Sequence, residues 1–320
     1  IVIDPTNPNK IFAASMGNPF LRDNDRGLYR SLDAGNSWTQ VLFASNQAGA
    51  IDVVIDSNNP YLVYASTWDR IRTNQESVAR GPNAKIWKST NGGQSFSTLS
   101  GGGWPMGDQS RIGLSIFPGN PSTIFAVVVS TTYMIEGIYK STNQGTSWTN
   151  ITGDLPPGMT GGFGWYFGQI RVNPTNINEI YVLGVDLYKT TNGGINWFMA
   201  APSWCSYQVH ADKHDLQFDI SGNIILATDG GLYETKNGGN TWDDIENITN
   251  TQFYRVAYNP HQPQNYYGGA QDNGSTGGNS SNINNWPRIF GGDGFQMRFD
   301  PNQNNVSYVE TQNGRLWYTI

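Results

Sequence analysis

The stretch Gly231–Trp242 reads Gly-Leu-Tyr-Glu-Thr-Lys-Asn-Gly-Gly-Asn-Thr-Trp, and the chain repeats its pattern along its length. Each copy has a short apolar segment with an aromatic residue, a Ser or Thr, an Asn or Asp, a Gly and a closing Trp or Phe. A phrase repeated in this way indicates one structural unit used several times. The other copies are Gly27–Trp38, Ile86–Phe96, Gly137–Trp148 and Asp186–Trp197.

The repeated phrase predicts a β-hairpin that is held by its own turn. Ser or Thr and Asx side chains hydrogen-bond nearby backbone amides, and Gly supplies a positive φ at no steric cost. The closing aromatic is expected to fold back over the hairpin as an apolar lid. We interpret these residues as structural and call each copy a staple. The staple residues are Ser31, Asp33, Gly35, Trp38, Asn91, Gly93, Asn143, Gly145, Trp148, Asn192, Gly194, Trp197, Asn237, Gly239 and Trp242.

A second phrase predicts where each sheet begins: an apolar strand, a turn rich in Asn and Pro, and another apolar strand. Apolar residues alternate with polar ones in these strands, as where Ile170 and Val172 flank Arg171. Period-two alternation without helical periodicity predicts an all-β fold, and radial repetition of four-stranded sheets protects strand edges. The sequence therefore predicts a β-propeller of about seven four-stranded blades, the sixth without a staple and the last truncated. The predicted starts are Ile1–Ser15, Val53–Ser66, Leu114–Ser130, Ile170–Gly184, Leu216–Thr228, Val256–Gly269 and Met297–Glu310.

Proline is expected in the turn of these phrases, where no ladder donor is needed. The Asn-Pro pairs are Asn7-Pro8, Asn59-Pro60, Asn120-Pro121 and Asn173-Pro174. Function in such a fold is expected in inserted loops on the rims. These loops are Met16–Arg26, Trp68–Ala84, Ser100–Ser110, Asp154–Gly168, Ala201–His210 and Gly274–Trp286.

Composition excludes several classes of protein. The net charge is −6 and no basic run is present, so nucleic acid is not an expected partner. No apolar stretch approaches the roughly 20 residues of a membrane span, so we expect no membrane insertion. The single cysteine, Cys205, excludes an internal disulfide framework and is interpreted as a small buried apolar residue. We interpret residues 1–320 as one propeller domain cut at both ends from a longer polypeptide.

The segment His210–His214 is a candidate site. In an extended strand His210, Asp212 and His214 project from one face, a spacing compatible with divalent metal ligation. General acid–base chemistry and a structural hydrogen-bond network are the alternatives. No further ligand can be identified, so no cofactor is assigned.

Three acidic turns contain Asp229, Asp272 and Asp293, each within two residues of a glycine and close to an apolar strand. Glycosidic bond hydrolysis needs paired carboxylates, one as acid and one as base or nucleophile. The three residues are thus catalytic candidates. The alternative is that Asp-Gly and Asp-Asn-Gly form ordinary turns.

Arginines near strand starts and tryptophans in the loops are candidate ligand-binding residues. The arginines share one parity in different blades and can bind a carboxylate or sulfate, or pair with the acids above. Indole rings can stack on sugars, although packing between blades is an alternative role. The residues are Arg111, Arg171, Arg255, Arg298, Trp104, Trp165, Trp204 and Trp286, with His210 and His214.

The staples resemble the Asp-box (BNR) repeat of sialidases, sortilin-type receptors and xyloglucanase-type glycoside hydrolases. The stretch from His210 onward resembles secreted bacterial propeller proteins with sortilin-like repeats, through phrases such as His210-x-Asp212-x-His214 and Gly268–Gly274. Such proteins are common in Bacteroidetes with type IX secretion, so the resemblance implies a secreted or surface location. Xyloglucanase-type enzymes carry a catalytic Asp in a Thr-Asp-x-Gly-Gly phrase of the first blade, where this chain has Ser15-Met16-Gly17-Asn18.

The leading interpretation is a secreted or surface-exposed propeller that binds polysaccharide or protein ligands. The alternative is a polysaccharide-degrading glycoside hydrolase that uses two of Asp229, Asp272 and Asp293. Two exposed carboxylates at a separation of roughly 5–9.5 Å in an aromatic-lined cleft favour hydrolysis. Occupation of all three carboxylates in turns or ion pairs favours binding.

Overall fold

The computed structural model describes residues 1–201, 209–245, 251–281 and 285–319. The chain divides into two compact units, residues 1–228 with 233–244 and residues 229–232 with 245–320. The described helices are 3-10 turns, η1 (Pro157–Thr160) and η3 (Gln312–Gly314), so the all-β prediction is confirmed. In the described chain no helix has the length and apolar character needed to cross a membrane.

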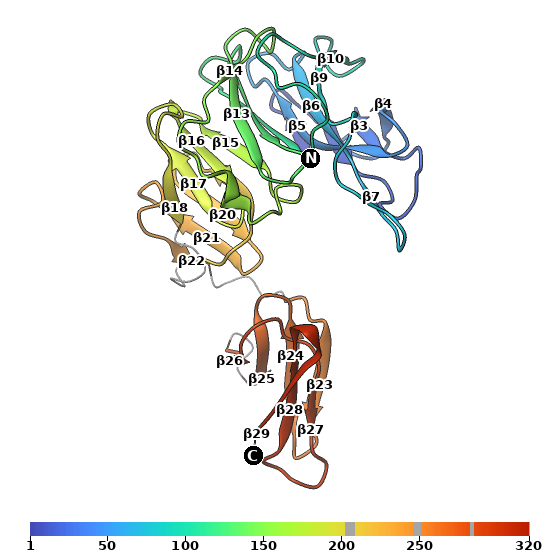
Figure 1. Cartoon of the computed structure of the whole chain (residues 1–320), viewed down its shortest axis with the longest axis vertical. Coiled ribbons are helices and arrows are strands. Elements are labelled where there is room, and N and C mark those ends of the chain that lie inside the picture. Colours follow the sequence, from blue (N-terminus) through green and yellow to red (C-terminus); the bar gives the residue numbers. More distant parts are fainter. Residues whose placement is uncertain (202–208, 246–250, 282–284, 320) are drawn as a thin grey trace. The chain divides into compact units, whose positions relative to one another are not determined.

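The first unit contains five four-stranded sheets that follow one another in chain order (Figure 1). In each sheet the first two strands form a hairpin, as the start phrases predict. The short pair β7 (Ile71–Arg72) and β8 (Ser77–Val78) lies within the predicted loop Trp68–Ala84. The sheets are β1 (Val2–Asp4), β2 (Asn7–Ser15), β3 (Gly27–Ser31), β4 (Thr39–Leu42); β5 (Ala48–Ile55), β6 (Val63–Asp69), β9 (Ile86–Ser89), β10 (Ser97–Leu99); β11 (Ile112–Ile116), β12 (Ile124–Val129), β13 (Ile135–Ser141), β14 (Thr149–Asn150); β15 (Gln169–Asn173), β16 (Asn176–Leu183), β17 (Leu187–Thr190), β18 (Phe198–Ala201); and β19 (Lys213–Phe218), β20 (Ile224–Thr228), β21 (Gly231–Thr235), β22 (Asp243–Asp244).

The second unit contains a four-stranded and a three-stranded sheet. The turn Asp229–Leu232, between β20 and β21, is grouped with this unit. The three-stranded sheet corresponds to the predicted truncated last blade. The strands are β23 (Arg255–Asn259), β24 (Gln262–Ala270), β25 (Gly274–Asn279), β26 (Arg288–Phe290), and β27 (Met297–Phe299), β28 (Ser307–Thr311), β29 (Arg315–Thr319).

The core of the first unit lies between neighbouring sheets, and β12 shows how. Its residues are all fully buried, and successive side chains point to opposite faces. Phe125, Val127 and Val129 pack with residues of β15 and β16. The alternate residues, from Ile124 to Val128, pack with residues of β6 and β11. Burial on both faces explains the continuous apolar run Ile124–Val129.

The staple turns form the same hydrogen bonds in each copy. In the third copy Ser141 Oγ accepts from Gly145 N at 2.8 Å and donates to Asn143 Oδ1, which also accepts from Ser147 N. Gly145 has φ 85°, as predicted for its position. Trp148, Trp197 and Trp242 are buried, whereas Trp38 is partly exposed. The polar turn is therefore repeated more strictly than the aromatic lid.

Two predicted turns are different in the structure. Asn7-Pro8 lies inside β2, and the turn is Asp4–Thr6, where Asp4 Oδ1 accepts from Thr6 N. The glycine-rich segment predicted as a loop, Gly274–Trp286, begins with strand β25 paired to β24. Its glycines match close neighbours: a Cβ on Gly277 would lie 2.4 Å from the Tyr267 ring.

Candidate functional site

The three acidic turns are brought together in the second unit. Asp293 Oδ1 accepts from the backbone N–H of Asp272 at 2.9 Å, and Asp293 N donates to Gln312 Oε1. Asn273 Nδ2 donates to Asp229 O at 3.1 Å. A carboxylate oxygen of Asp229 and one of Asp272 lie within 4.8 Å of each other. Asp229 and Asp272 therefore form a carboxylate pair. The Asp293 carboxylate accepts a hydrogen bond from the turn that contains Asp272.

The backbone places these carboxylates through unusual geometry. Asp272 has φ 58°, a left-handed conformation, between β24 and β25. Short polar Asp and Asn tolerate this region better than most residues. Gly294, after Asp293, is required by packing, because a Cβ there would lie 2.1 Å from Gly274 O.

A second candidate site is a groove in the first unit. Its volume is about 720 Å³, and it is lined by residues of the first strands of the five sheets and by Arg111. Hydrogen bonds join neighbouring strands along it. Asp52 Oδ2 accepts from Leu114 N at 2.9 Å, and Ser115 Oγ accepts from Val172 N at 3.1 Å.

The carboxylates of the groove are engaged by backbone and side-chain donors. Asp52 Oδ1 accepts from Val53 N, in addition to its bond from Leu114. Asp215 Oδ1 accepts from Arg171 Nη2 at 2.7 Å and from Leu216 N, and its Oδ2 accepts from the Gln217 side chain. These contacts make both acids structural links of the groove.

Arg111 is buried at the groove wall. Its Nη1 donates to the carbonyl of Tyr166, and its Nε is buried without a hydrogen-bond partner among the described residues. Burial lowers the pKa of the Arg111 guanidinium to about 10, with Asp52 acting in the opposite direction and Arg171 adding to the decrease. Two of the four predicted arginines, Arg111 and Arg171, thus line one groove.

An aromatic cluster borders the groove. Trp165 stacks on Trp68 with ring centres 6.2 Å apart, and the Arg70 guanidinium lies 4.8 Å from the Trp165 ring centre. Tyr166 contacts the His214 ring at 5.3 Å and is about half exposed (49%). In this cluster Tyr166 is the more exposed residue, although Trp165, Phe167 and His214 contact its ring.

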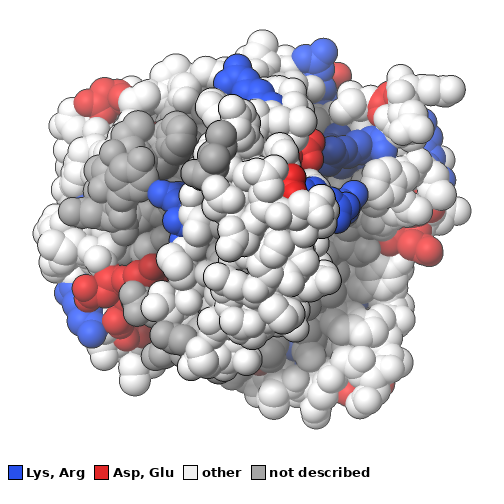
Figure 2. Space-filling view, turned by 90° about the horizontal axis from the view of Figure 1, so that it is seen from below, with Lys and Arg blue, Asp and Glu red and all other residues white. Residues whose placement is uncertain are grey.

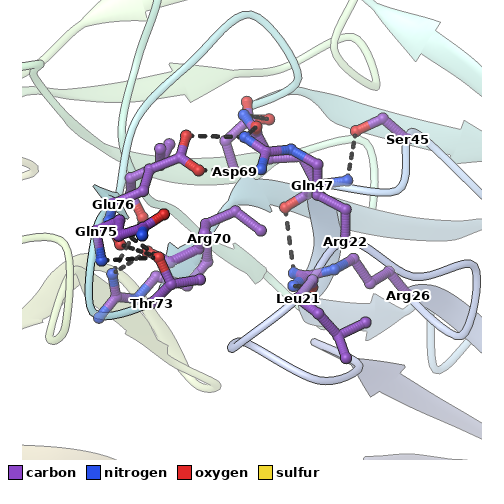
Figure 3. A network of polar contacts seen from close by, with 12 residues as sticks. Leu21, Arg22, Arg26, Ser45, Gln47, Asp69, Arg70, Thr73, Gln75 and Glu76 are labelled. Atoms are coloured by element: carbon purple, nitrogen blue, oxygen red, sulfur yellow. Dashed lines mark hydrogen bonds and ion pairs between the residues drawn. The ribbon is translucent and has the colours of Figure 1, made fainter.

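The rim beside this cluster is tied together by charged groups (Figure 3). Arg22 forms two hydrogen bonds with Glu76, at 2.9 and 2.8 Å, and a third with Gln47. Gln47 in turn donates to the buried Asp69. Because Arg22 and Glu76 are both substantially exposed, solvent screens this pair and it contributes little stability. It joins the loop after β2 to the β7–β8 hairpin.

The segment His210–His214 is not an extended strand. β19 begins at Lys213, and Asp212 has φ 65°, so the alternation expected for His210, Asp212 and His214 does not apply. His210 Nδ1 lies 2.9 Å from Ala211 O, and the His214 ring packs on Tyr166. Their ligand atoms do not all lie within 4.8 Å of one another. Metal ligation by this trio stays a prediction that rests on the sequence alone.

Lys213, within the same segment, is a residue that the sequence interpretation missed. It is fully buried, and its Nζ donates to Val185 O and His210 O, both at 2.9 Å. Burial lowers its pKa to about 8, although Asp186 favours the charged form. The sequence around Lys213 does not indicate that it is buried, because the two carbonyl groups that bind it are brought together only by the fold.

The remaining predicted residues lie apart from these sites or outside the described chain. Trp104 packs on Trp148 at 4.9 Å, so it belongs to the packing between sheets rather than to an open ligand face. Trp286 stacks on Phe253 in the second unit. Arg255 and Arg298 are exposed in that unit. Trp204 and Cys205 lie outside the described residues.

Basic and acidic side chains lie in small, separate groups on the face drawn in Figure 2. Uncharged residues cover most of that face. A ligand there would meet local charged groups rather than a broad field of one sign.

The chain is similar to several proteins that are named as xyloglucanases or GH74 enzymes. A xyloglucanase from a Paenibacillus species is 22% identical over 288 residues, 77% of this chain and 26% of the relative. The crystal structure of the GH74 xyloglucanase from Xanthomonas campestris has a TM-score of 0.56 at 15% identity, over 99% of this chain and 51% of that one. An ancestral GH74 enzyme gives a TM-score of 0.54 at 17% identity, over 99% and 44%. No protein-family model matches the sequence.

The structural likeness supports the β-propeller class of fold. The chain spans about a quarter of the curated relative and about half of the solved GH74 structures. The number of blades in the whole protein is therefore not fixed by these comparisons.

Proposed function

We propose that this chain is part of a glycoside hydrolase that acts on a polysaccharide. The observation that carries the proposal is the pair of carboxylates in the second unit, Asp229 and Asp272, within 4.8 Å of each other. Measured between oxygens, the pair lies below the roughly 5–9.5 Å of the sequence criterion and nearest to the roughly 5–5.5 Å of retaining enzymes, so it suits an acid and a nucleophile rather than an acid and a base. The similarity to proteins named xyloglucanases supports this choice of chemistry and makes xyloglucan the first substrate to test.

The test measures reducing ends released from a panel of polysaccharides by the wild-type protein and by Asp229→Asn, Asp272→Asn and Asp293→Asn. We expect turnover to fall by at least about a hundredfold in the first two variants, because each loses a group that acts in the reaction. Asp293→Asn is expected to retain more activity, since its carboxylate supports the Asp272 backbone.

The matched control is Asp300→Asn in the same unit. Asp300 Oδ1 accepts from Asn302 N and Gln303 N in the turn between β27 and β28, so it is a turn acid far along the chain from the pair. Equal turnover by the wild type and both Asp229→Asn and Asp272→Asn, with all proteins folded, contradicts the proposal.

The second candidate function is ligand binding without hydrolysis. It is favoured by the groove of the first unit, where Asp52 and Asp215 are held by hydrogen bonds and the half-exposed Tyr166 stands at the border. An exposed ring of this kind can stack on a sugar. This candidate is supported if the wild-type protein binds polysaccharide but releases no reducing ends. Binding is then expected to be lost in Tyr166→Ala and kept in Tyr61→Ala.

An extracellular polysaccharide as the ligand requires export of the protein. Secretion is part of the proposal and is tested by locating the protein in culture medium, cell-surface and cytoplasmic fractions of its native cells. Recovery in the cytoplasmic fraction alone contradicts it.

A further inference from the structure

Arg111 is a buried cation with most of its hydrogen-bonding capacity unused. Its exposed fraction is 8%, and the one hydrogen bond described for it runs from Nη1 to Tyr166 O. Its Nε is buried and has no partner among the described residues. A guanidinium carries five N–H donors, and burial without partners disfavours the charged form. The groove wall therefore holds a donor group that suits an acceptor ligand.

The nearby acids are bound by other donors, and the Asp52 charge acts on Arg111 without a direct ion pair. Asp52 accepts backbone N–H groups with both oxygens. Asp215 is bound by Arg171, Leu216 N and Gln217. Arg111 makes no ion pair within the part of the chain that the structure describes.

The surroundings of Arg111 also contain a second cation and a half-exposed aromatic residue. Arg171 lines the same groove, as do Gln169 and His214. The residue that receives the Arg111 hydrogen bond, Tyr166, has its ring about half exposed. A Cβ on Gly168 would lie 3.3 Å from Arg111 Cδ, so the loop approaches the arginine closely because it has glycine there.

We propose that Arg111 forms an oxyanion-binding subsite for an acidic polysaccharide, with a sugar ring placed on Tyr166 and with Arg171, held by Asp215 and Gln169, as a neighbouring positive charge. A carboxylate or sulfate oxygen pair matches the planar fork of a guanidinium. The oxyanion comes from a uronic acid or from a sulfate ester, which present the same chemistry to the site. In naming a polysaccharide the inference rests on the proposed function, but the subsite itself is independent of the acidic turns.

The test compares three probes by titration calorimetry: an oligogalacturonate, a sulfated galactan oligosaccharide and a neutral cello-oligosaccharide. We expect at least one acidic probe to bind, with an affinity that falls as NaCl is raised. In Arg111→Gln this affinity is expected to drop by about tenfold or more, because a charge-assisted hydrogen bond is lost. Neutral probe binding is expected to change by less than about twofold. Binding of only one acidic probe identifies the source of the oxyanion.

Arg255→Gln is the matched control, since Arg255 is an exposed arginine of the second unit. If Arg111→Gln does not fold, the salt dependence of the wild-type protein and the loss of affinity in Tyr166→Ala decide the question. Binding of neither acidic probe overturns the inference. So does an affinity that Arg111→Gln leaves unchanged in a folded protein. If the protein binds acidic probes through Arg111 but hydrolyses no polysaccharide, the proposed hydrolase activity is contradicted and the oxyanion-binding subsite is supported.

Discussion

Asp33 shows how one charge changes a repeated turn. The other four staples have asparagine at this position, Asn91, Asn143, Asn192 and Asn237. In the first staple Ser37 Oγ donates to Asp33 Oδ2 at 2.6 Å, whereas Asn143 Nδ2 donates to Ser147 Oγ in the third. The hydroxyl reverses its role, and the turn keeps its shape.

The Asp33 carboxylate makes the first hairpin sensitive to acid. Hydrogen bonds from the Ser37 side chain and backbone, followed by Ser31, lower the pKa of Asp33 to about 2. Because the folded pKa lies below the unfolded value, the stabilisation is present above about pH 4 and is lost as the pH falls toward 2. Hydrogen exchange of the Gly35 and Ser37 amides between pH 5 and 2, corrected for intrinsic rates, is expected to lose protection.

Asp33→Asn is the natural control, since the other staples already use asparagine. The variant is expected to show less acid-dependent loss of protection at these two amides. Identical pH profiles for the variant and the wild type contradict the assignment.

Lys213 is expected to give a pH dependence of the same sign as Asp33, but in the alkaline range. Its folded pKa of about 8 lies below the ordinary value of 10.5, so the unfolded chain binds more protons between these values. The free energy of unfolding is therefore expected to increase as the pH rises from 8 to 9.5. Complete titration of Lys213 between its folded and unfolded pKa values corresponds to about 3 kcal/mol, and this pH range covers part of it. Urea denaturation at pH 7.5, 8.5 and 9.5 measures this gain.

Lys213→Met removes the titrating group while keeping a side chain of similar length. The variant is expected to lose the gain between pH 8 and 9.5, although it also loses the bonds to Val185 O and His210 O. A slope in the variant equal to that of the wild type excludes Lys213 as its source.

Some site residues could be predicted from single positions, and others could not. Asp229 and Asp293 have an adjacent glycine and Asp272 has one two residues later, and the three acids lie together in the second unit. Asp52 carried no signal because its role depends on Leu114 N of the neighbouring sheet. A hydrogen-bond partner on a neighbouring sheet is determined by how the two sheets pack, which the sequence of one strand does not show.

At the scale of elements, the strands were predictable because their alternation and turn residues are local. The start phrases locate the first two strands of each sheet. The division of β12 between two cores could not be predicted, because an apolar run does not show which neighbour each face meets. The strand β25 was not predicted because its many glycines are typical of a turn. Glycine is needed in this strand because a neighbouring aromatic ring packs closely against it, and the sequence does not show that contact.

The two-sided packing of β12 predicts a large effect of truncation. Phe125 is fully buried within the core that β12 shares with β15 and β16. Phe125→Ala is expected to lower the free energy of unfolding by about 3–5 kcal/mol, from lost burial and the cavity left behind. Urea denaturation followed by tryptophan fluorescence measures the change.

Ile220→Ala provides the comparison, because Ile220 is fully exposed in the turn between β19 and β20. Its substitution is expected to change stability by less than about 0.5 kcal/mol. Similar losses for the two variants contradict the assignment of the core.

At the scale of the molecule, the two candidate sites belong to different compact units. The groove with Arg111 lies in the first unit, and the carboxylate pair lies in the second. The sequence predicts one propeller domain because its repeats continue through residue 320, and this stays a prediction. Local repeats fix the sheets, whereas the grouping of sheets into units depends on contacts between them.

The charge of the whole chain predicts its solubility. The net charge is −6 at pH 7 and the isoelectric point is about 5.0. The second unit exposes large apolar side chains, including Val256, Leu316 and Tyr318. Because charge repulsion between copies is weakest near the isoelectric point, these side chains are expected to drive association there. Light scattering at fixed concentration is expected to peak near pH 5 and to be lowest at pH 7 and above.

Lys236→Glu tests whether net charge is the cause. Lys236 is largely exposed, and its ion pair with Glu234 is a surface contact at 3.3 Å, so the fold is expected to tolerate the change. The substitution makes the net charge more negative by two, and the scattering maximum is expected to move to lower pH. A maximum that stays in place while Leu316→Ser reduces its height assigns association to the apolar surface alone, independent of net charge.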